Sequence, residues 1–139
     1  MLIGDFSSDI VSRMRETIIG VMGPGNADQE VLSLAEELGA LIAENGWTLL
    51  TGGRSSGVME AASKGAKSRN GRTIGILPFR DLDLAKVSSY VDVPILTGMW
   101  DARNAINVLS SQVVLVCGMS SGTASEAAWL SRLIDQLCW

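Results

Sequence analysis

The stretch from Gln112 to Glu126 constrains the fold of this chain more than any other. It begins with an apolar run, Val113–Cys117, which is followed by a turn of small residues and then by helical spacing. A short apolar run between turn formers is typical of a strand buried on both faces in a parallel sheet. The turn, from Gly118 to Thr123, has two glycines and three hydroxyl residues. Its N–H groups precede a helix N-terminus, where the helix dipole favours negative charge. The stretch therefore predicts an anion site, and phosphate is the anion that we expect.

Two similar strand–turn–helix units lie upstream. The apolar strands Thr17–Met22 and Trp47–Thr51 are followed by glycine-rich turns at 23–26 and 52–57. Helical patterns follow both turns and end at Asn-Gly pairs. The predicted anion-binding residues of the three turns are Gly23, Pro24, Gly25, Gly52, Gly53, Arg54, Ser55, Ser56, Gly57, Gly118, Ser120, Ser121, Gly122 and Thr123.

Strands and helices alternate along the whole chain. Two more strands are predicted at 73–78 and 90–96, with Pro94 assigning the second to an edge of the sheet. This alternation predicts a doubly wound, Rossmann-like α/β fold: a mostly parallel sheet of about five or more strands between two helical layers. We expect residues 1–16 to form an N-terminal arm and residues 17–139 a single domain. Residues 79–90 are predicted to form a surface excursion or a lid.

In such sheets, ligands bind beyond the carboxyl ends of the strands. All three glycine-rich turns join a strand to the following helix, so we expect them at this one edge. The dinucleotide pattern Gly-x-Gly-x-x-Gly is broken by Asp28, and no Gly-Lys-Ser/Thr sequence occurs. The chain therefore lacks the motifs of NAD-binding and P-loop proteins.

Composition excludes several classes of function. The 139 residues carry a net charge of −4, which argues against a nucleic-acid-binding face. No histidine occurs, so His-dependent triads and imidazole metal ligands are absent, and two cysteines suggest no metal site. No apolar run or signal-peptide pattern points to a membrane, and we expect a cytoplasmic protein. With 47% hydrophobic residues and a mean hydropathy of +0.26, we expect a homo-oligomer, either a dimer or a tetramer.

Three charged residues are candidates for contact with the ligand, and each has a structural alternative. Arg54, within the second turn, is either a phosphate contact or a solvated loop charge. Arg103, one turn into the helix before the last strand, either stabilises the site or pairs with Asp101 or another carboxylate. Glu126 either forms a capping box with Thr123 or contacts a bound sugar and acts in acid–base chemistry.

These motifs resemble a known family. Gly52-Gly53-x-x-x-Gly57-Val58-Met59, together with Gly118-x-x-x-Gly122-Thr123-x-x-Glu126, is similar to the LOG family of "lysine decarboxylase-like" nucleotide-binding proteins. The resemblance extends from about Thr17 to Leu137. One branch of the family hydrolyses nucleoside 5′-monophosphates, and another consists of molybdenum cofactor carrier proteins.

The resemblance implies two functions. In the hydrolase branch, Glu126 and Arg103 match the catalytic glutamate and arginine. However, the chain lacks that branch's Pro-Gly-Gly lead, and Asn104 replaces its lysine. These differences favour the carrier branch, which implies that the chain binds molybdenum cofactor (molybdopterin), with molybdenum cofactor-dependent enzymes as partners. The alternative is a phosphoribohydrolase that cleaves the N-glycosidic bond.

Overall fold

The computed structural model describes residues 15–119 together with residues 124 and 128. In chain order its elements are β1 (Ile18–Met22), α2 (Gln29–Glu44), β2 (Thr48–Thr51), α3 (Gly57–Ser68), β3 (Thr73–Leu77), α4 (Leu82–Ala85), β4 (Val93–Leu96), the 3-10 helix η1 (Trp100–Ala102), α5 (Arg103–Leu109) and β5 (Val113–Val116). The strands of this part of the chain form one parallel sheet in the order β4-β3-β2-β1-β5. The predicted doubly wound α/β fold is therefore confirmed.

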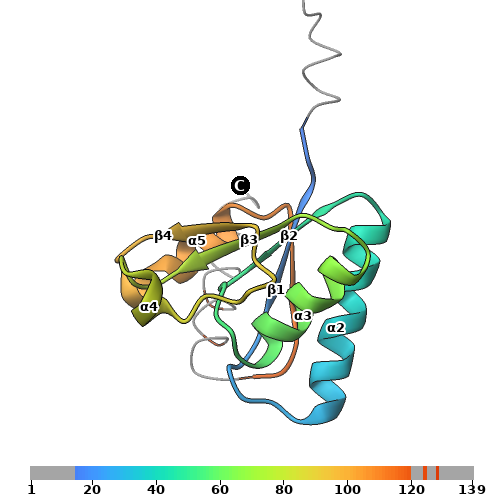
Figure 1. Ribbon diagram of the computed structural model, residues 1–139, viewed down its shortest axis with the longest axis horizontal. Coiled ribbons are helices and arrows are strands. Elements are labelled where there is room, and N and C mark those ends of the chain that lie inside the picture. Colours follow the sequence, from blue (N-terminus) through green and yellow to red (C-terminus); the bar gives the residue numbers. More distant parts are fainter. Residues whose placement is uncertain (1–14, 120–123, 125–127, 129–139) are drawn as a thin grey trace, which may run out of the picture.

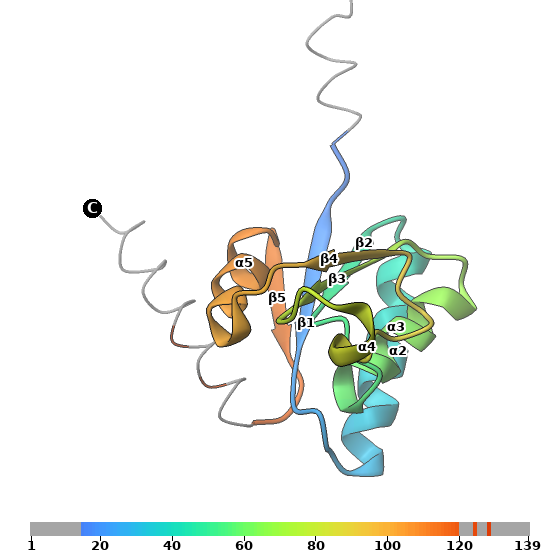
Figure 2. The same cartoon turned by 60° about the vertical axis from the view of Figure 1, so that its left-hand side comes forward.

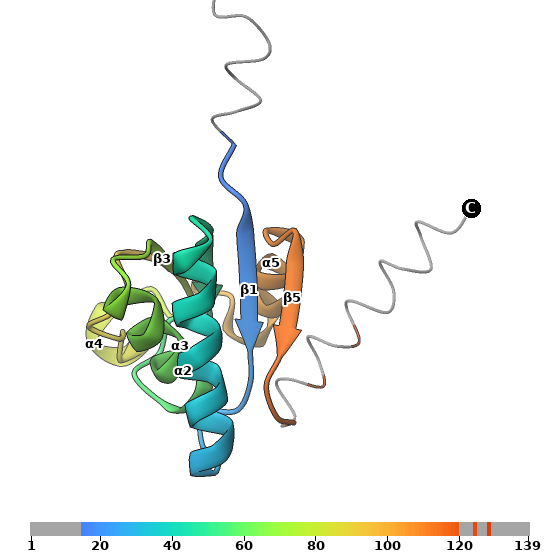
Figure 3. The ribbon, with the colours of Figure 1, turned by 90° about the vertical axis from the view of Figure 1, so that its right-hand side faces the viewer.

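The helices form a layer on each face of the sheet. Helices α2 and α3 lie on one face and α5 lies on the other (Figures 1, 2 and 3). From β1 the chain adds β2, β3 and β4 in one direction, whereas β5 pairs with the other side of β1. The strand order therefore reverses between β1 and β5, which is where ligands bind in folds of this kind.

The core follows from the alternation of side chains along buried strands. Ile19 and Val21 of β1 pack toward the α2 and α3 layer, with Ile42 and Val58 among their neighbours. On the opposite face, Met22 packs in a cluster to which Ile106 of α5 contributes. Both faces of β1 are thus covered, which explains why its sequence is a continuous apolar run.

Glycines allow α2 and α3 to pack closely. A Cβ atom added at Gly39 would lie 2.0 Å from the backbone oxygen of Ala62, and one at Gly65 would lie 1.8 Å from that of Glu36. The two backbones are therefore in direct contact, with no space for a methyl group. This contact fixes the position of α3 relative to α2.

The predicted strand bounds hold with small shifts. Strand β4 begins at Val93 rather than at residue 90, because Tyr90 and Asp92 bond to Thr73 before the ladder starts. Pro94 lies in this strand, at one edge of the sheet that the structure describes. Among the described residues, no helix is both long enough and apolar enough to span a membrane.

Candidate anion-binding site

The turns that follow β1, β2 and β5 are in contact at the carboxyl edge of the sheet. The N–H of Val58 donates to the carbonyl oxygen of Pro24 at 3.1 Å. A Cβ atom at Gly57 would lie 2.2 Å from that same oxygen, and one at Gly23 would lie 2.4 Å from the carbonyl oxygen of Cys117. Only glycine fits at Gly23 and Gly57, because the turns approach each other so closely. The predicted site residues that this contact brings together are Gly23, Pro24, Gly25, Ser56, Gly57 and Gly118.

The second turn is held by a distant part of the chain. The N–H of Ser55 donates to the carbonyl oxygen of Lys86 at 2.8 Å, and the N–H of Ser88 donates to that of Gly53 at 2.9 Å. Arg54 and Val87 form an antiparallel bridge between these two bonds. The segment predicted as an excursion or lid therefore runs along the second turn and fixes its backbone.

Arg54 is half-buried within this turn. Its Nε atom is buried and has no hydrogen-bond partner among the described residues. A guanidinium N–H that has lost water without gaining an acceptor is costly, by about 1–3 kcal/mol or more. An acceptor that reaches Nε would offset this cost.

Arg103 binds main-chain oxygens at the ends of two strands. Its Nη1 donates to the carbonyl oxygen of Gly52 at 2.9 Å and also to that of Ile76. A Cβ atom at Gly52 would lie 2.5 Å from this nitrogen, so only glycine leaves room for the guanidinium. These bonds join α5 to the ends of β2 and β3, and they give Arg103 a positioning role in the turn.

Helices α2 and α3, which open at this edge, begin without side-chain caps. Asp28 and Ser56 are the N-cap residues of α2 and α3, and neither side chain accepts a capping hydrogen bond. Of the first-turn groups of α3, the Val58 N–H donates to Pro24. The positive end of the α3 dipole thus lies in the same turn as Arg54.

The third turn is described only at its beginning. Gly118 has a positive φ of 76° and lies against Pro24 and Val31. Cys117 is buried in the core, and burial raises the pKa of its thiol. The predicted residues Ser120, Ser121, Gly122, Thr123 and Glu126 lie outside the described residues.

Two buried amides lie near Arg103 in the chain. The sequence analysis noted Asn104 only as a replacement for the hydrolase branch's lysine, and it did not identify Asn107. Asn104 is 4% exposed and Asn107 is fully buried. Asparagine at the inward positions of an otherwise apolar helix is the signal that could have identified them, because buried amides need hydrogen-bond partners. Asn107 accepts a hydrogen bond at its carbonyl oxygen from Ser111, where α5 ends.

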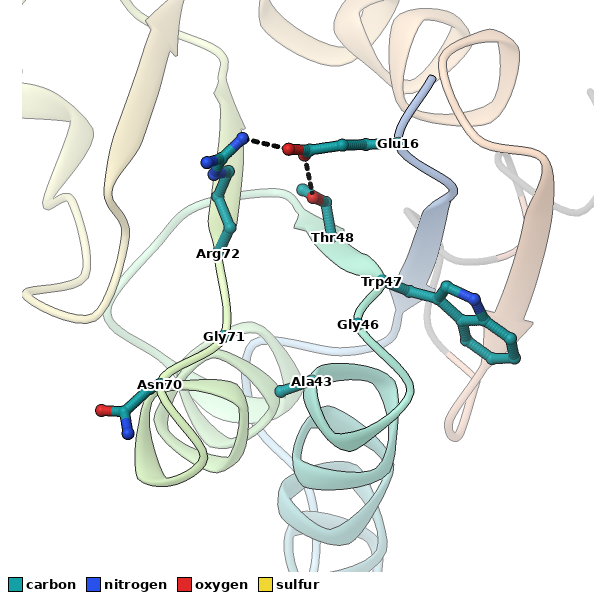
Figure 4. A pocket seen from close by; sticks show the side chains of 8 residues that line it. All are labelled: Glu16, Ala43, Gly46, Trp47, Thr48, Asn70, Gly71 and Arg72. Atoms are coloured by element: carbon teal, nitrogen blue, oxygen red, sulfur yellow. Dashed lines mark hydrogen bonds and ion pairs between the residues drawn. The ribbon is translucent and has the colours of Figure 1, made fainter. Parts of the chain in front are cut away.

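A hollow lies at the opposite edge of the sheet, at the amino ends of β2 and β3 (Figure 4). Glu16 there accepts hydrogen bonds from Thr48, at 2.6 Å, and from Arg72. The charges of Glu16 and Arg72 neutralise each other in this ion pair. The hollow therefore offers an anion much less than the carboxyl edge does.

Comparison with known proteins supports the motif resemblance. The model of the SLOG cluster4 family (LDcluster4) matches residues 16–133. The solved structure of the molybdenum cofactor binding protein from Rippkaea orientalis is 55% identical and has a TM-score of 0.83, over 86% of this chain and 73% of that one. The molybdenum cofactor carrier protein of Chlamydomonas reinhardtii is 51% identical and has a TM-score of 0.79, over 86% and 72%.

A relative with an enzyme name is more distant. The cytokinin riboside 5′-monophosphate phosphoribohydrolase of Mycobacterium tuberculosis is 33% identical over 103 residues, which are 72% of this chain. The matched region spans about half of that enzyme, 54% of its length. Motifs, fold and similarity agree, and the chain belongs to the SLOG cluster4 family of LOG-like proteins.

Proposed function

We propose that this protein binds molybdenum cofactor as a carrier or storage protein, and that the phosphate of the cofactor lies at the carboxyl edge of the sheet. The observation that supports this most is the environment of the Arg54 side chain. Its buried Nε lacks an acceptor among the described residues, and it lies in the turn that opens α3 without a side-chain cap. The names of the two solved relatives agree with this ligand.

The residues of the site fit the chemistry of such a cargo. Molybdopterin ends in a phosphate, which is bound best by backbone N–H groups at a helix N-terminus and by an arginine. Glycine at positions 23, 52 and 57 keeps side chains away from the turn backbones. The cofactor supplies redox chemistry to the enzyme that finally receives it, so the task of this chain is to bind and protect.

Charge reversal at Arg54 tests the proposal. A hydrogen bond to a charged group contributes about 1.5–3 kcal/mol. Arg54→Glu also introduces repulsion, so we expect retention of molybdenum cofactor to fall by at least roughly tenfold. Retention is measured on the purified protein from the fluorescence of the oxidised pterin.

Arg69→Glu is the matched control, because it makes the same charge change at the far end of α3, where Arg69 pairs with Glu44. It should retain cofactor as the unchanged protein does. Equal retention by Arg54→Glu and Arg69→Glu would remove Arg54 from the site.

A nucleoside-monophosphate phosphoribohydrolase is the second candidate, favoured by the similarity to the mycobacterial enzyme. In that function Glu126 would act on the ribose or on water, and Arg103 would stabilise the site. Incubation with AMP should then release adenine, and Glu126→Ala should abolish the release. The bonds from Arg103 to Gly52 and Ile76 support a positioning role, so Arg103→Lys should slow release less than Glu126→Ala does.

The proposal also covers the compartment, the oligomeric state and the partners of the carrier. We expect it in the cytoplasm as a homo-oligomer that passes its cargo to molybdenum cofactor-dependent enzymes. Size measurement of the purified protein and cofactor transfer to an apo-enzyme test these two expectations separately.

A further inference from the structure

A shallow hollow of about 350 Å³ lies at the carboxyl ends of β3 and β4. Its lining includes the aromatic rings of Phe79 and Trp100. It also includes the guanidinium of Arg80 and the aliphatic side chain of Leu84. The rings of Phe79 and Trp100 meet edge to face, with centroids 4.9 Å apart and planes at 80°. Figure 1 shows the same edge, where the end of β4 and the short helix α4 lie together. The sequence analysis did not identify this hollow.

Trp100 adopts a costly conformation without being buried. Its φ is +50°, which a bulky side chain rarely adopts, and its N–H donates to the carbonyl oxygen of Pro78 at 3.0 Å. Its side chain is nevertheless 67% exposed. The described residues thus hold the indole in place without covering it, and contact with another molecule would compensate for the strain.

Arg80 adds a positive charge to the hollow. Its side chain passes directly over Gly98, where an added Cβ atom would lie 2.5 Å from its Cγ and Nε. It forms no ion pair with a described residue. Its neighbour Asp81 accepts from the N–H groups of residues 83 and 84, at the start of α4. The guanidinium is therefore available to oxygen or nitrogen acceptors.

The hollow is next to the second glycine-rich turn. Arg103, three residues after Trp100, donates to the carbonyl oxygens of Gly52 and Ile76. The same short segment, η1 and the start of α5, thus contacts the anion site with Arg103 and lines the hollow with Trp100. This proximity in the chain suits a ligand with a phosphate at one end and a ring at the other.

We propose that this hollow binds the flat, nitrogen-containing heterocycle of the phosphate-bearing ligand. The ring stacks on Trp100 and its polar edge accepts hydrogen bonds from Arg80. The volume lies within the range of small-molecule sites and is too small for a protein segment of any length. This inference rests on the proposed function, because it places the second half of the same ligand.

Three probes separate the ring from the phosphate: neopterin 3′-phosphate, glycerol 3-phosphate and neopterin. Calorimetry on the intact protein should give a neopterin 3′-phosphate affinity about tenfold or more above that of glycerol 3-phosphate. In Trp100→Ala, the affinity for neopterin 3′-phosphate should fall to that for glycerol 3-phosphate. The affinity for glycerol 3-phosphate itself should stay unchanged. Trp100→Phe should keep part of the difference, and Leu109→Ala, at a similarly exposed site on α5, should keep all of it.

Three other outcomes contradict the inference, and one leaves it standing but contradicts the proposed phosphate site. Equal losses for both phosphate probes in Trp100→Ala would mean a general structural effect. A change of molecular mass without a change in probe discrimination would mean that a second copy of the chain covers Trp100. If neopterin binding depends on Trp100 while its phosphate adds nothing, the ring site stands and the proposed phosphate site fails. If no probe binds, both fail.

Discussion

Individual arginines at the carboxyl edge differ in what they bind. Arg54 offers a buried donor that has no acceptor among the described residues, whereas Arg103 donates to two backbone carbonyls. The sequence analysis left two roles open for the Arg103 side chain: stabilising the site or forming an ion pair with a carboxylate. The structure adds two backbone acceptors to these alternatives, and they lie 51 and 27 residues away in the chain.

Removing the Arg103 guanidinium should destabilise the fold. In Arg103→Met, two carbonyl oxygens lose a charged donor, and we expect the free energy of unfolding to fall by about 2–4 kcal/mol. Urea denaturation measures the change. Arg69→Met, which breaks an exposed ion pair with Glu44, should cost less than about 1 kcal/mol. Similar losses in the two variants would contradict the positioning role of Arg103.

The secondary-structure elements were largely predictable from the sequence, whereas several tertiary contacts between distant segments were not. The strands β1, β2 and β3 are apolar runs between turn formers, and Pro94 placed β4 at an edge. The contact of three glycine-rich turns also followed, because parallel strands end at one edge. The pairing of residues 86–88 with the second turn and the positive φ of Trp100 did not follow. Both depend on tertiary contacts that no local pattern encodes.

The start of β4 depends on one carboxylate. Burial raises the pKa of Asp92, but hydrogen bonds from Lys67 and Thr73 outweigh it, so the pKa is lowered from its ordinary value of 3.8. A carboxyl whose pKa is depressed by folding stabilises the fold above its unfolded pKa, and this stabilisation is lost as the pH falls through the folded pKa.

Asp92→Asn should therefore lower the free energy of unfolding at pH 7. The difference from the unchanged protein should shrink below about pH 4, where the carboxylate of the unchanged protein becomes protonated. Urea denaturation along a pH series measures this difference. A deficit that stays constant down to pH 2 would show that the charge of Asp92 has no role.

At the scale of the whole molecule, large apolar side chains on and beside α2 are exposed in the part of the chain that the structure describes. On α2, Leu34 is 49% exposed and Leu41 is 45% exposed, and Trp47 beyond the helix is 41% exposed. Leu34 and Leu41 are seven residues apart, so they lie on one face of the helix. Such a patch commonly marks a contact between proteins.

We predict that α2 lies between copies of the chain. Leu41→Glu should shift the mass of the purified protein toward the monomer in light scattering coupled to gel filtration. Leu109→Glu, the same change at a 62% exposed position on α5, across the sheet, should not shift it. A monomeric unchanged protein, or loss of association in Leu109→Glu alone, would contradict this assignment.

The backbone contact between α2 and α3 limits where the protein can deform. Since neither Gly39 nor Gly65 tolerates an extra carbon atom, we expect these helices to move together. Any change of backbone conformation on ligand binding must then occur across the sheet or in the segment from Pro78 to Arg103. Directed evolution toward new cargoes should accordingly succeed by varying that segment, while positions 39 and 65 stay fixed.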